Sequence, residues 1–249
     1  MSNLSRALGL TMAVSLTLIS FLSIAEESSL ARVYTLQVSY DQQPDFEKAF
    51  KDHIAWRKKA EDPWQWMAYQ VIDGEGIGNY IVRSGNHKWA DFSASDEFGK
   101  KSAKQWREGP AKYVARVSSH TTTTWQDTIN WPEENFDPQF FQINEYRVKI
   151  GKMEQLHQAA REMHKAIMEH KWPVNYAFVQ IDSGGPANQV TLVLPYLSWS
   201  AMEQPEVKLQ EVLVKTYGEE KAADILGRWS DAVLEINTFM LRKRGDLVE

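Results

Sequence analysis

The chain has 249 residues, of which 43% are hydrophobic and 24% are charged, and its formal net charge is −5. This composition is typical of a globular protein and excludes an intrinsically disordered chain. The negative charge argues against nucleic acid as a partner, because phosphate binding needs a basic face. The chain has no cysteine, which excludes disulfides and thiolate metal sites.

The first 25 residues have the pattern of a secretory signal peptide. A short positive region ends at Arg6, a nearly continuous apolar run follows over residues 7–24, and Ser23 and Ala25 supply the small residues of a cleavage site. A membrane anchor is the alternative, but the run is shorter than about 20 residues and contains serine and threonine. We therefore expect an exported protein, periplasmic or extracellular, without membrane contact after cleavage.

The first half of the remaining chain is predicted to contain four strands and two helical regions. Residues 33–40 alternate, with Tyr34, Leu36 and Val38 on one face of a strand and Thr35, Gln37 and Ser39 on the other. The elements expected after it are a helix opening at 44–45, strands at 66–72 and 79–83, a broken helical region at 89–114 and a strand at 118–125.

A polar linker with two prolines is expected at 127–139, and the second half then repeats the same order. The elements expected there are a strand at 141–149, a helix at 152–171, strands at 174–182 and 189–194, helical stretches at 199–229 broken at Gly218, and a strand at 233–242.

The two halves match each other in sequence at offsets of 107 to 110 positions. VYTLQVSYDQQPDFEKAF corresponds to FFQINEYRVKIGKMEQLH, AYQVID to AFVQID, and Trp89 to Trp199. One βαββαβ unit buries one sheet face under helices and leaves the other open, so two units in one chain can cover each other. The predicted fold is α+β, with tandem ferredoxin-like units at 26–126 and 140–249 whose antiparallel sheets pack face to face as an intrachain α/β barrel.

The segment EYRVKIGKMEQ, a helix, an aromatic strand, a Gly-Pro turn and then VTLVLPYLSWSAM resembles the NIPSNAP-type branch of the dimeric α/β-barrel superfamily. The resemblance covers residues 140–202 and reaches the first half only through the repeat. Relatives of that architecture include cofactor-free monooxygenases, haem-degrading enzymes, chlorite-dismutase-like haem proteins and members without known activity. It implies a fold and leaves the function open. Two chains build the barrel in single-unit members, so this tandem chain is expected to form its own; further assembly is left open.

If the sheets face each other, the polar faces of their strands line a shared interior, where a ligand would bind. Alternation places there Thr35, Gln37, Ser39, Gln142, Asn144, Tyr146, His120, Thr122, Thr124, Glu235 and Asn237. A register slip of one residue would turn a whole set outward. The alternative is that these groups bond only to one another or to water.

A few of these residues are candidates for chemistry. The resemblance implies that Asn144 holds a substrate, as a first-strand asparagine does in the cofactor-free monooxygenases, with Trp66 as the nearby aromatic residue. His120 is a candidate general base or axial haem ligand, and Tyr146 could act near a substrate. The other histidines lack metal-ligand spacing, and His157, His164 and His170 are interpreted as solvated-face or helix-end residues. Trp56, Trp64, Trp66 and Trp172 either plug the barrel ends or line a pocket.

Three functions remain open on the sequence. We favour an exported protein that binds a small molecule in the barrel interior. The alternatives are a cofactor-free monooxygenase or haem-dependent enzyme, and an interaction module with a filled interior.

The glycines at 74, 76 and 78 lie between two strands and so are no dinucleotide fingerprint. No metal site is predicted, and haem is the cofactor that the resemblance brings into consideration.

Overall fold

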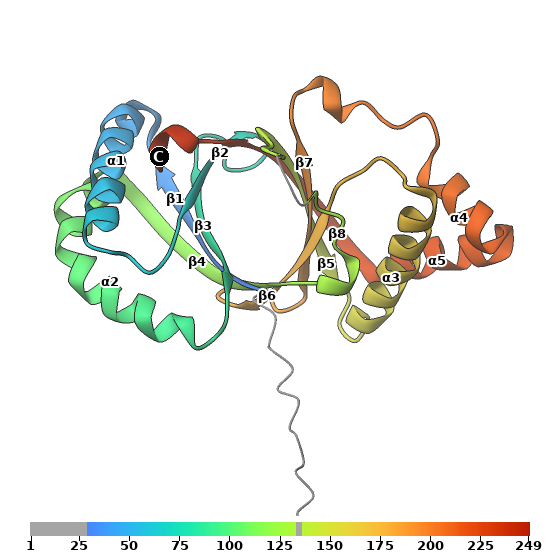
Figure 1. Cartoon of the computed structure of the whole chain (residues 1–249). Helices are drawn as coiled ribbons and strands as arrows, with labels where there is room; N and C mark the ends of the chain where they lie inside the picture. Colours follow the sequence, from blue (N-terminus) through green and yellow to red (C-terminus); the bar gives the residue numbers. More distant parts are fainter. Residues whose placement is uncertain (1–28, 133–135) are drawn as a thin grey trace, which may run out of the picture.

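The computed structural model describes residues 29–132 and 136–249, so the expected signal peptide lies outside the described residues. In the described parts eight antiparallel strands form a closed ring in the order β1-β3-β2-β8-β5-β7-β6-β4 (Figure 1). The elements are β1 (Leu30–Val38), α1 (Gln43–Lys59), β2 (Met67–Asp73), β3 (Tyr80–His87), α2 (Asp91–Glu108), β4 (Val114–Thr124), β5 (Phe140–Val148), α3 (Met153–His170), β6 (Ala177–Ser183), β7 (Gln189–Tyr196), α4 (Leu209–Tyr217), α5 (Glu219–Ala232) and β8 (Val233–Lys243).

The ring consists of two sheets of the same topology. The first has the order β4-β1-β3-β2 and the second the order β8-β5-β7-β6, so the last strand of each unit lies beside its first. The sheets join at two reciprocal seams, β2 with β8 and β4 with β6. The predicted fold of two tandem ferredoxin-like units forming an intrachain barrel is confirmed.

Each seam is accompanied by a glycine in a hairpin turn. Gly184 has φ +83°, and a Cβ atom there would overlap the Ser119 carbonyl oxygen and lie 2.9 Å from the Cα atom of His120. In the other unit, Gly74 has φ +88°, and its Cβ atom would lie 2.7 Å from that of Phe239. Each turn therefore lies directly on the closing strand of the other unit, in a conformation that favours glycine.

The helices cover the outer faces of the two sheets, α1 and α2 on the first and α3, α4 and α5 on the second (Figure 1). Under α1, Phe46, Phe50 and Ile54 pack against the outward-facing strand residues Leu36 and Val82. The second sheet packs in the same way against α3 and α5, and a further apolar cluster joins α3, α4 and α5. As predicted, the helical region breaks at Gly218, which has φ +79°.

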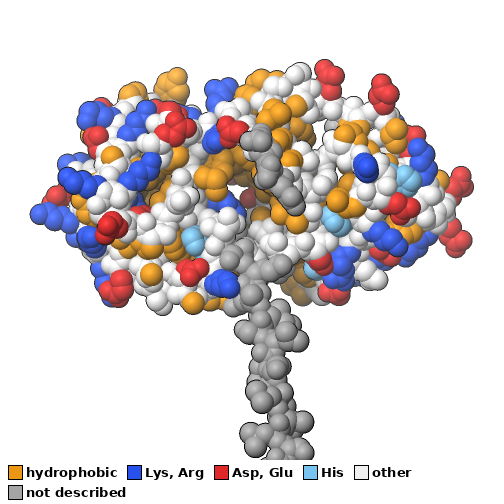
Figure 2. Space-filling view, in the orientation of Figure 1, with side chains coloured by type: hydrophobic (Ala, Val, Ile, Leu, Met, Phe, Trp, Pro, Cys, Tyr) orange, Lys and Arg blue, Asp and Glu red, His pale blue; other side chains and the backbone are white. Residues whose placement is uncertain are grey.

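A separate apolar cluster lies on the inner face of the ring. It joins Tyr69 and Val71 of β2 to Phe141 and Ile143 of β5 and Leu241 of β8. Strand pairing extends this inner face to Thr35, which lies opposite Ile81, and to Asn237, which lies opposite Glu145. Figure 2 looks along the ring, and the surface is hollowed near its centre, where hydrophobic side chains gather.

The predicted strand faces are correct in the first unit and wrong for β5. Tyr34 and Leu36 pack under the helices, which turns Thr35 inward. In β5, however, Gln142 and Tyr146 line a cavity with helix residues, so Asn144 between them also faces outward. The prediction assumed that polar residues of β5 would face inward. The inner face instead takes the apolar residues Phe141 and Ile143, and a polar set lies under the helices.

Two features are absent from the described residues, a metal-binding group and a membrane-spanning helix. Residues 29–132 and 136–249 contain no group of three or more histidine, cysteine or acidic side chains placed to hold a metal ion. Over the same ranges, the helices are all too short or too polar to cross a bilayer.

Candidate functional site

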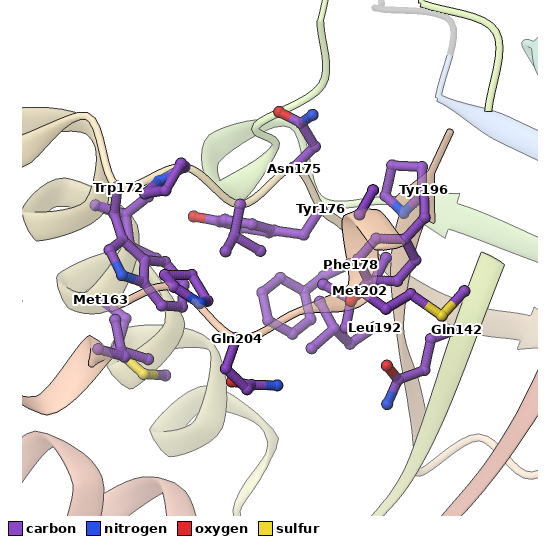
Figure 3. A pocket seen from close by; sticks show the side chains of 18 of the residues that line it. Gln142, Met163, Trp172, Asn175, Tyr176, Phe178, Leu192, Tyr196, Met202 and Gln204 are labelled. Atoms are coloured by element: carbon purple, nitrogen blue, oxygen red, sulfur yellow. The ribbon is translucent and has the colours of Figure 1, made fainter. Parts of the chain in front are cut away.

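A cavity of about 520 Å³ lies between the second sheet and its covering helices. Its floor is formed by outward-facing residues of β5, β6 and β7, and its roof by α3 and α5. The loop after α3 and the loop after β7 close its sides. The residues shown in Figure 3 include Gln142, Met163, Trp172, Asn175, Tyr176, Phe178, Leu192, Tyr196, Met202 and Gln204. A volume of this size suits a small organic ligand.

Aromatic rings form much of the cavity wall. The Trp229 ring of α5 stands edge-on to Tyr146 at 5.1 Å between centroids and is tilted against Phe178 at 5.7 Å. Tyr176 stands edge-on to Phe178 at 5.8 Å. Rings held at several angles by one another present fixed apolar surfaces, which favours a flat aromatic ligand.

An amide pair lies at the β5 side of the cavity. Gln142 lines the cavity and its Nε2 atom donates to Oδ1 of Asn144 at 3.2 Å. Asn144 is only 7% exposed. Its contact with Gln142 fixes the direction of the Gln142 amide, which can therefore meet a ligand oxygen at a defined position.

A tyrosine and a histidine form a hydrogen-bonded pair at the opposite wall. The Tyr176 hydroxyl lies 2.9 Å from Nδ1 of His164 on α3. Burial raises the pKa of Tyr176 and lowers the pKa of His164. Both groups are therefore neutral near pH 7, so the tyrosine can donate its proton to the imidazole. Tyr176 lines the cavity and His164 lies behind it, which is the arrangement of a short proton relay.

The expected partner of Asn144 lies elsewhere. Trp66 belongs to the first unit, where its Nε1 atom donates to Asp62 at 2.9 Å and its ring packs against Tyr34 at 5.9 Å. The prediction that Trp66 and Asn144 act together is wrong, because each lies under the helices of its own unit. Trp172 and Trp229 are the tryptophans that line the 520 Å³ cavity of the second unit.

The remaining predicted site residues keep to the ring interior but do not form one cluster. Gln37 is exposed and pairs with Arg116 at one end of β1, whereas His120 lies further along β4 opposite Val33. Asn237 donates to Glu145 at 3.4 Å, and Glu235, exposed, lies opposite Arg147. Burial lowers the pKa of His120, and no hydrogen bond joins its ring to any residue of the described ranges.

A second, smaller cavity of about 350 Å³ occupies the equivalent place in the first unit. Trp66, His53 and Arg57 contribute to its lining. Arg57 is paired with Asp62 at 2.6 Å, and its guanidinium lies 5.1 Å from the centre of the Trp66 ring. The two cavities have thus diverged. The cavity of the first unit contains a paired cation and a histidine, whereas the cavity of the second unit is lined mainly by neutral groups.

The larger cavity does not fit haem. Its lining contains no histidine, cysteine, lysine or arginine, so the axial candidates are the thioethers of Met163 and Met202 and the tyrosine hydroxyls. Haem propionates usually need cationic partners, whereas the one formal charge of the lining is Glu203. A neutral aromatic molecule suits this donor set better.

Sequence reasoning missed the tyrosine–histidine pair. The sequence pattern predicts a solvated or terminal helix position for His164, but the side chain is partly buried and bonds to Tyr176. The available signal was the apolar side of β6 and β7, where Phe178, Leu192 and Leu194 belong to the face under the helices. Assigning that face first would have placed the cavity outside the ring.

No protein-family model and no curated protein matches the chain. Solved structures match its fold. A candidate monooxygenase from Lactobacillus acidophilus NCFM has 12% identity and a TM-score of 0.54, and the match covers 87% of this chain and 94% of that one. An anthrone oxidase-like protein has 9% identity and a TM-score of 0.52, with coverages of 88% and 92%.

A mutant chlorite dismutase from Candidatus Nitrospira defluvii has 8% identity and a TM-score of 0.51, and the match covers 90% of this chain and 95% of that one. These proteins have the dimeric α/β-barrel architecture. At such low identity the likeness concerns the fold alone.

Proposed function

We propose that the second-unit cavity binds a flat, largely apolar molecule that carries a phenol or ketone oxygen, and that the protein oxidises it with dioxygen and without a metal. The observation that carries this proposal is the Tyr176–His164 pair, whose hydroxyl faces an aromatic cavity at 2.9 Å from a neutral imidazole. The fold is consistent with it, since a candidate monooxygenase and an anthrone oxidase-like protein share the architecture.

The substrate class follows from the groups present. A relay of two neutral residues can remove a proton only from an activated position, such as a methylene group flanked by aromatic rings and conjugated with a carbonyl. The substrate C–H gives its proton to the Tyr176 oxygen while the Tyr176 proton passes to Nδ1 of His164. The amide of Gln142 donates to a substrate oxygen and favours the enolate charge that develops there.

The resulting carbanion adds dioxygen, and the imidazolium returns its proton to the peroxide. Loss of water then leaves a ketone, so that R₂CH₂ and O₂ give R₂C=O and H₂O. No external reductant is needed, because the substrate supplies all four electrons. The aromatic walls supply binding energy and exclude water from the carbanion.

Anthrone and its 1,8-dihydroxy derivative are suitable probes for this proposal. The purified protein is expected to consume one O₂ per anthrone and to form the quinone, with no loss on adding a chelator. Tyr176→Phe and His164→Gln should each lower kcat by about 10²-fold or more. Tyr217→Phe and His170→Gln are matched controls, because Tyr217 bonds to a helix carbonyl and His170 is exposed. Tight binding without oxygen uptake would refute the oxidation and support a binding protein.

Export and family branch are further parts of the proposal. The apolar segment at 7–24 and the small residues before position 26 support secretion with cleavage. N-terminal sequencing of the protein from a periplasmic or culture fraction should start near Glu26, and a full-length cytoplasmic product would contradict export. The segment 140–202 supports the NIPSNAP-type branch, which an alignment of homologues over that segment would test.

A further inference from the structure

The interior of the ring is hollow. Strand residues under the helices are mostly buried, as Leu36, Tyr80 and Val190 are. Residues that face inward at mid-strand nevertheless keep accessible surface, and these include Thr35, Ile81, Arg83, His120, Glu145, Thr191, Val193 and Phe239. Strands surround these side chains, so their accessible surface borders a lumen, consistent with the hollow in Figure 2. Barrels of eight strands either fill this space or hold one small ligand.

One side chain in this lumen has an unbalanced charge. Arg83 of β3 lies opposite Val33 of β1 and Met67 of β2, on the inner face. No hydrogen bond or ion pair joins its guanidinium to any residue in 29–132 or 136–249, and burial lowers its pKa. Enclosed charges in proteins are ordinarily paired, because an isolated one loses its hydration without compensation. The Arg83 guanidinium therefore has no anionic partner in the described residues, although an enclosed cation ordinarily has one.

The other ionisable groups of the lumen do not supply that anion. Lys243 is paired with Asp137, and Glu145 accepts a hydrogen bond from Asn237 on the second sheet. Glu235 is exposed and lies opposite Arg147. His120 lies opposite Val33 on the side away from Arg83, so the imidazole and the guanidinium flank the same residue.

Apolar groups lie next to this polar site. Ile81 neighbours Arg83 on β3 and pairs with Tyr69, which stands edge-on to Phe141 at 5.1 Å between ring centroids. The lumen thus combines the Arg83 cation with an apolar wall. We propose that it binds a small organic monocarboxylate whose head pairs with Arg83 and whose apolar body packs on Tyr69 and Phe141. This site lies on the opposite face of the second sheet from the 520 Å³ cavity and is independent of the oxidation.

The test compares two probes with the same body and different heads. Isothermal titration calorimetry should detect 2-naphthoate binding to the wild-type protein, with an affinity that Arg83→Gln lowers at least tenfold. The binding of 2-naphthol, which lacks the carboxylate, should not change in Arg83→Gln. Arg83→Lys should keep most of the naphthoate affinity, and Arg242→Gln, an exposed arginine on the outer face of β8, serves as the matched control.

Adjacent residues of β7 separate the lumen from the cavity. Val193 belongs to the inner cluster and Leu192 lines the cavity. Val193→Trp should abolish naphthoate binding, and Leu192→Trp should leave it unchanged. If Val193→Trp does not fold, the Arg83→Gln and Arg83→Lys pair decides the question. The inference is overturned by undiminished naphthoate binding in Arg83→Gln, by the reverse pattern in the two tryptophan variants, or by no naphthoate binding to the wild type.

Discussion

The contact between the turn after β6 and strand β4 makes Gly184→Ala a sharp test of barrel closure. The variant has two costs. An alanine at φ +83° costs about 1–2 kcal/mol, because the left-handed region is unfavourable for a residue with a Cβ atom. The Cβ atom would also overlap the Ser119 carbonyl oxygen, and overpacking of this kind costs about 1–3 kcal/mol. We therefore expect a loss of about 2–5 kcal/mol in the free energy of unfolding.

Gly151→Ala is the matched control. Gly151 has φ +81°, but a Cβ atom there would have no neighbour within 4 Å. The control has the backbone cost without the overlap, and both variants share the same change in unfolded-chain entropy. The difference between them should be about 1–3 kcal/mol in urea unfolding monitored by tryptophan fluorescence, or about 2–12 °C in melting temperature. Equal losses would refute the direct contact between this turn and β4.

Two further predictions concern stability. Burial lowers the pKa of His53, His87, His120 and His164 below 6.5, so the unfolded chain binds protons at a higher pH than the folded one. The free energy of unfolding should therefore fall as the pH drops below about 6.5. Glu145 opposes this change in part, because burial raises its pKa. Thermal melts between pH 7.5 and 5.5 would check the prediction, and an unchanged melting temperature would contradict it. Glu47 accepts hydrogen bonds from Tyr80 and Arg244, both at 2.6 Å, so Glu47→Gln should cost about 1–3 kcal/mol. Glu97→Gln, which removes an exposed pair with Lys100, should cost less than about 1 kcal/mol in the same urea assay.

The fold was accessible from the sequence because each of its signals is local. The alternation of Tyr34, Leu36 and Val38 predicts both a strand and the face that packs under the helices, and the structure confirms both. The repeat then assigns the same topology to the second half. Gly218 ends one helix and begins another as predicted, since its positive φ cannot be continued as a helix.

The candidate site could be predicted from the sequence only in part, because β5 carries both polar and apolar residues on each of its two faces. Phe141 and Ile143 face the lumen while Gln142 and Asn144 lie under the helices, so polarity alone gives the wrong face. The polarity pattern places Asn144 in the ring interior, whereas the structure places it on the face under the helices. The hydrogen bond between His164 and Tyr176 joins a helix to the segment after it. Its geometry depends on packing that no spacing rule encodes.

The fusion of two units in one chain has a consequence for how the cavities can change. In a dimer of identical single-unit chains, every substitution is made in both sites at once, and the two sites stay alike. Here the Trp66, His53 and Arg57 cavity of the first unit and the Tyr176 cavity of the second are encoded by different codons. A substitution in one cavity therefore leaves the lining of the other unchanged, so the two cavities can change independently within one barrel.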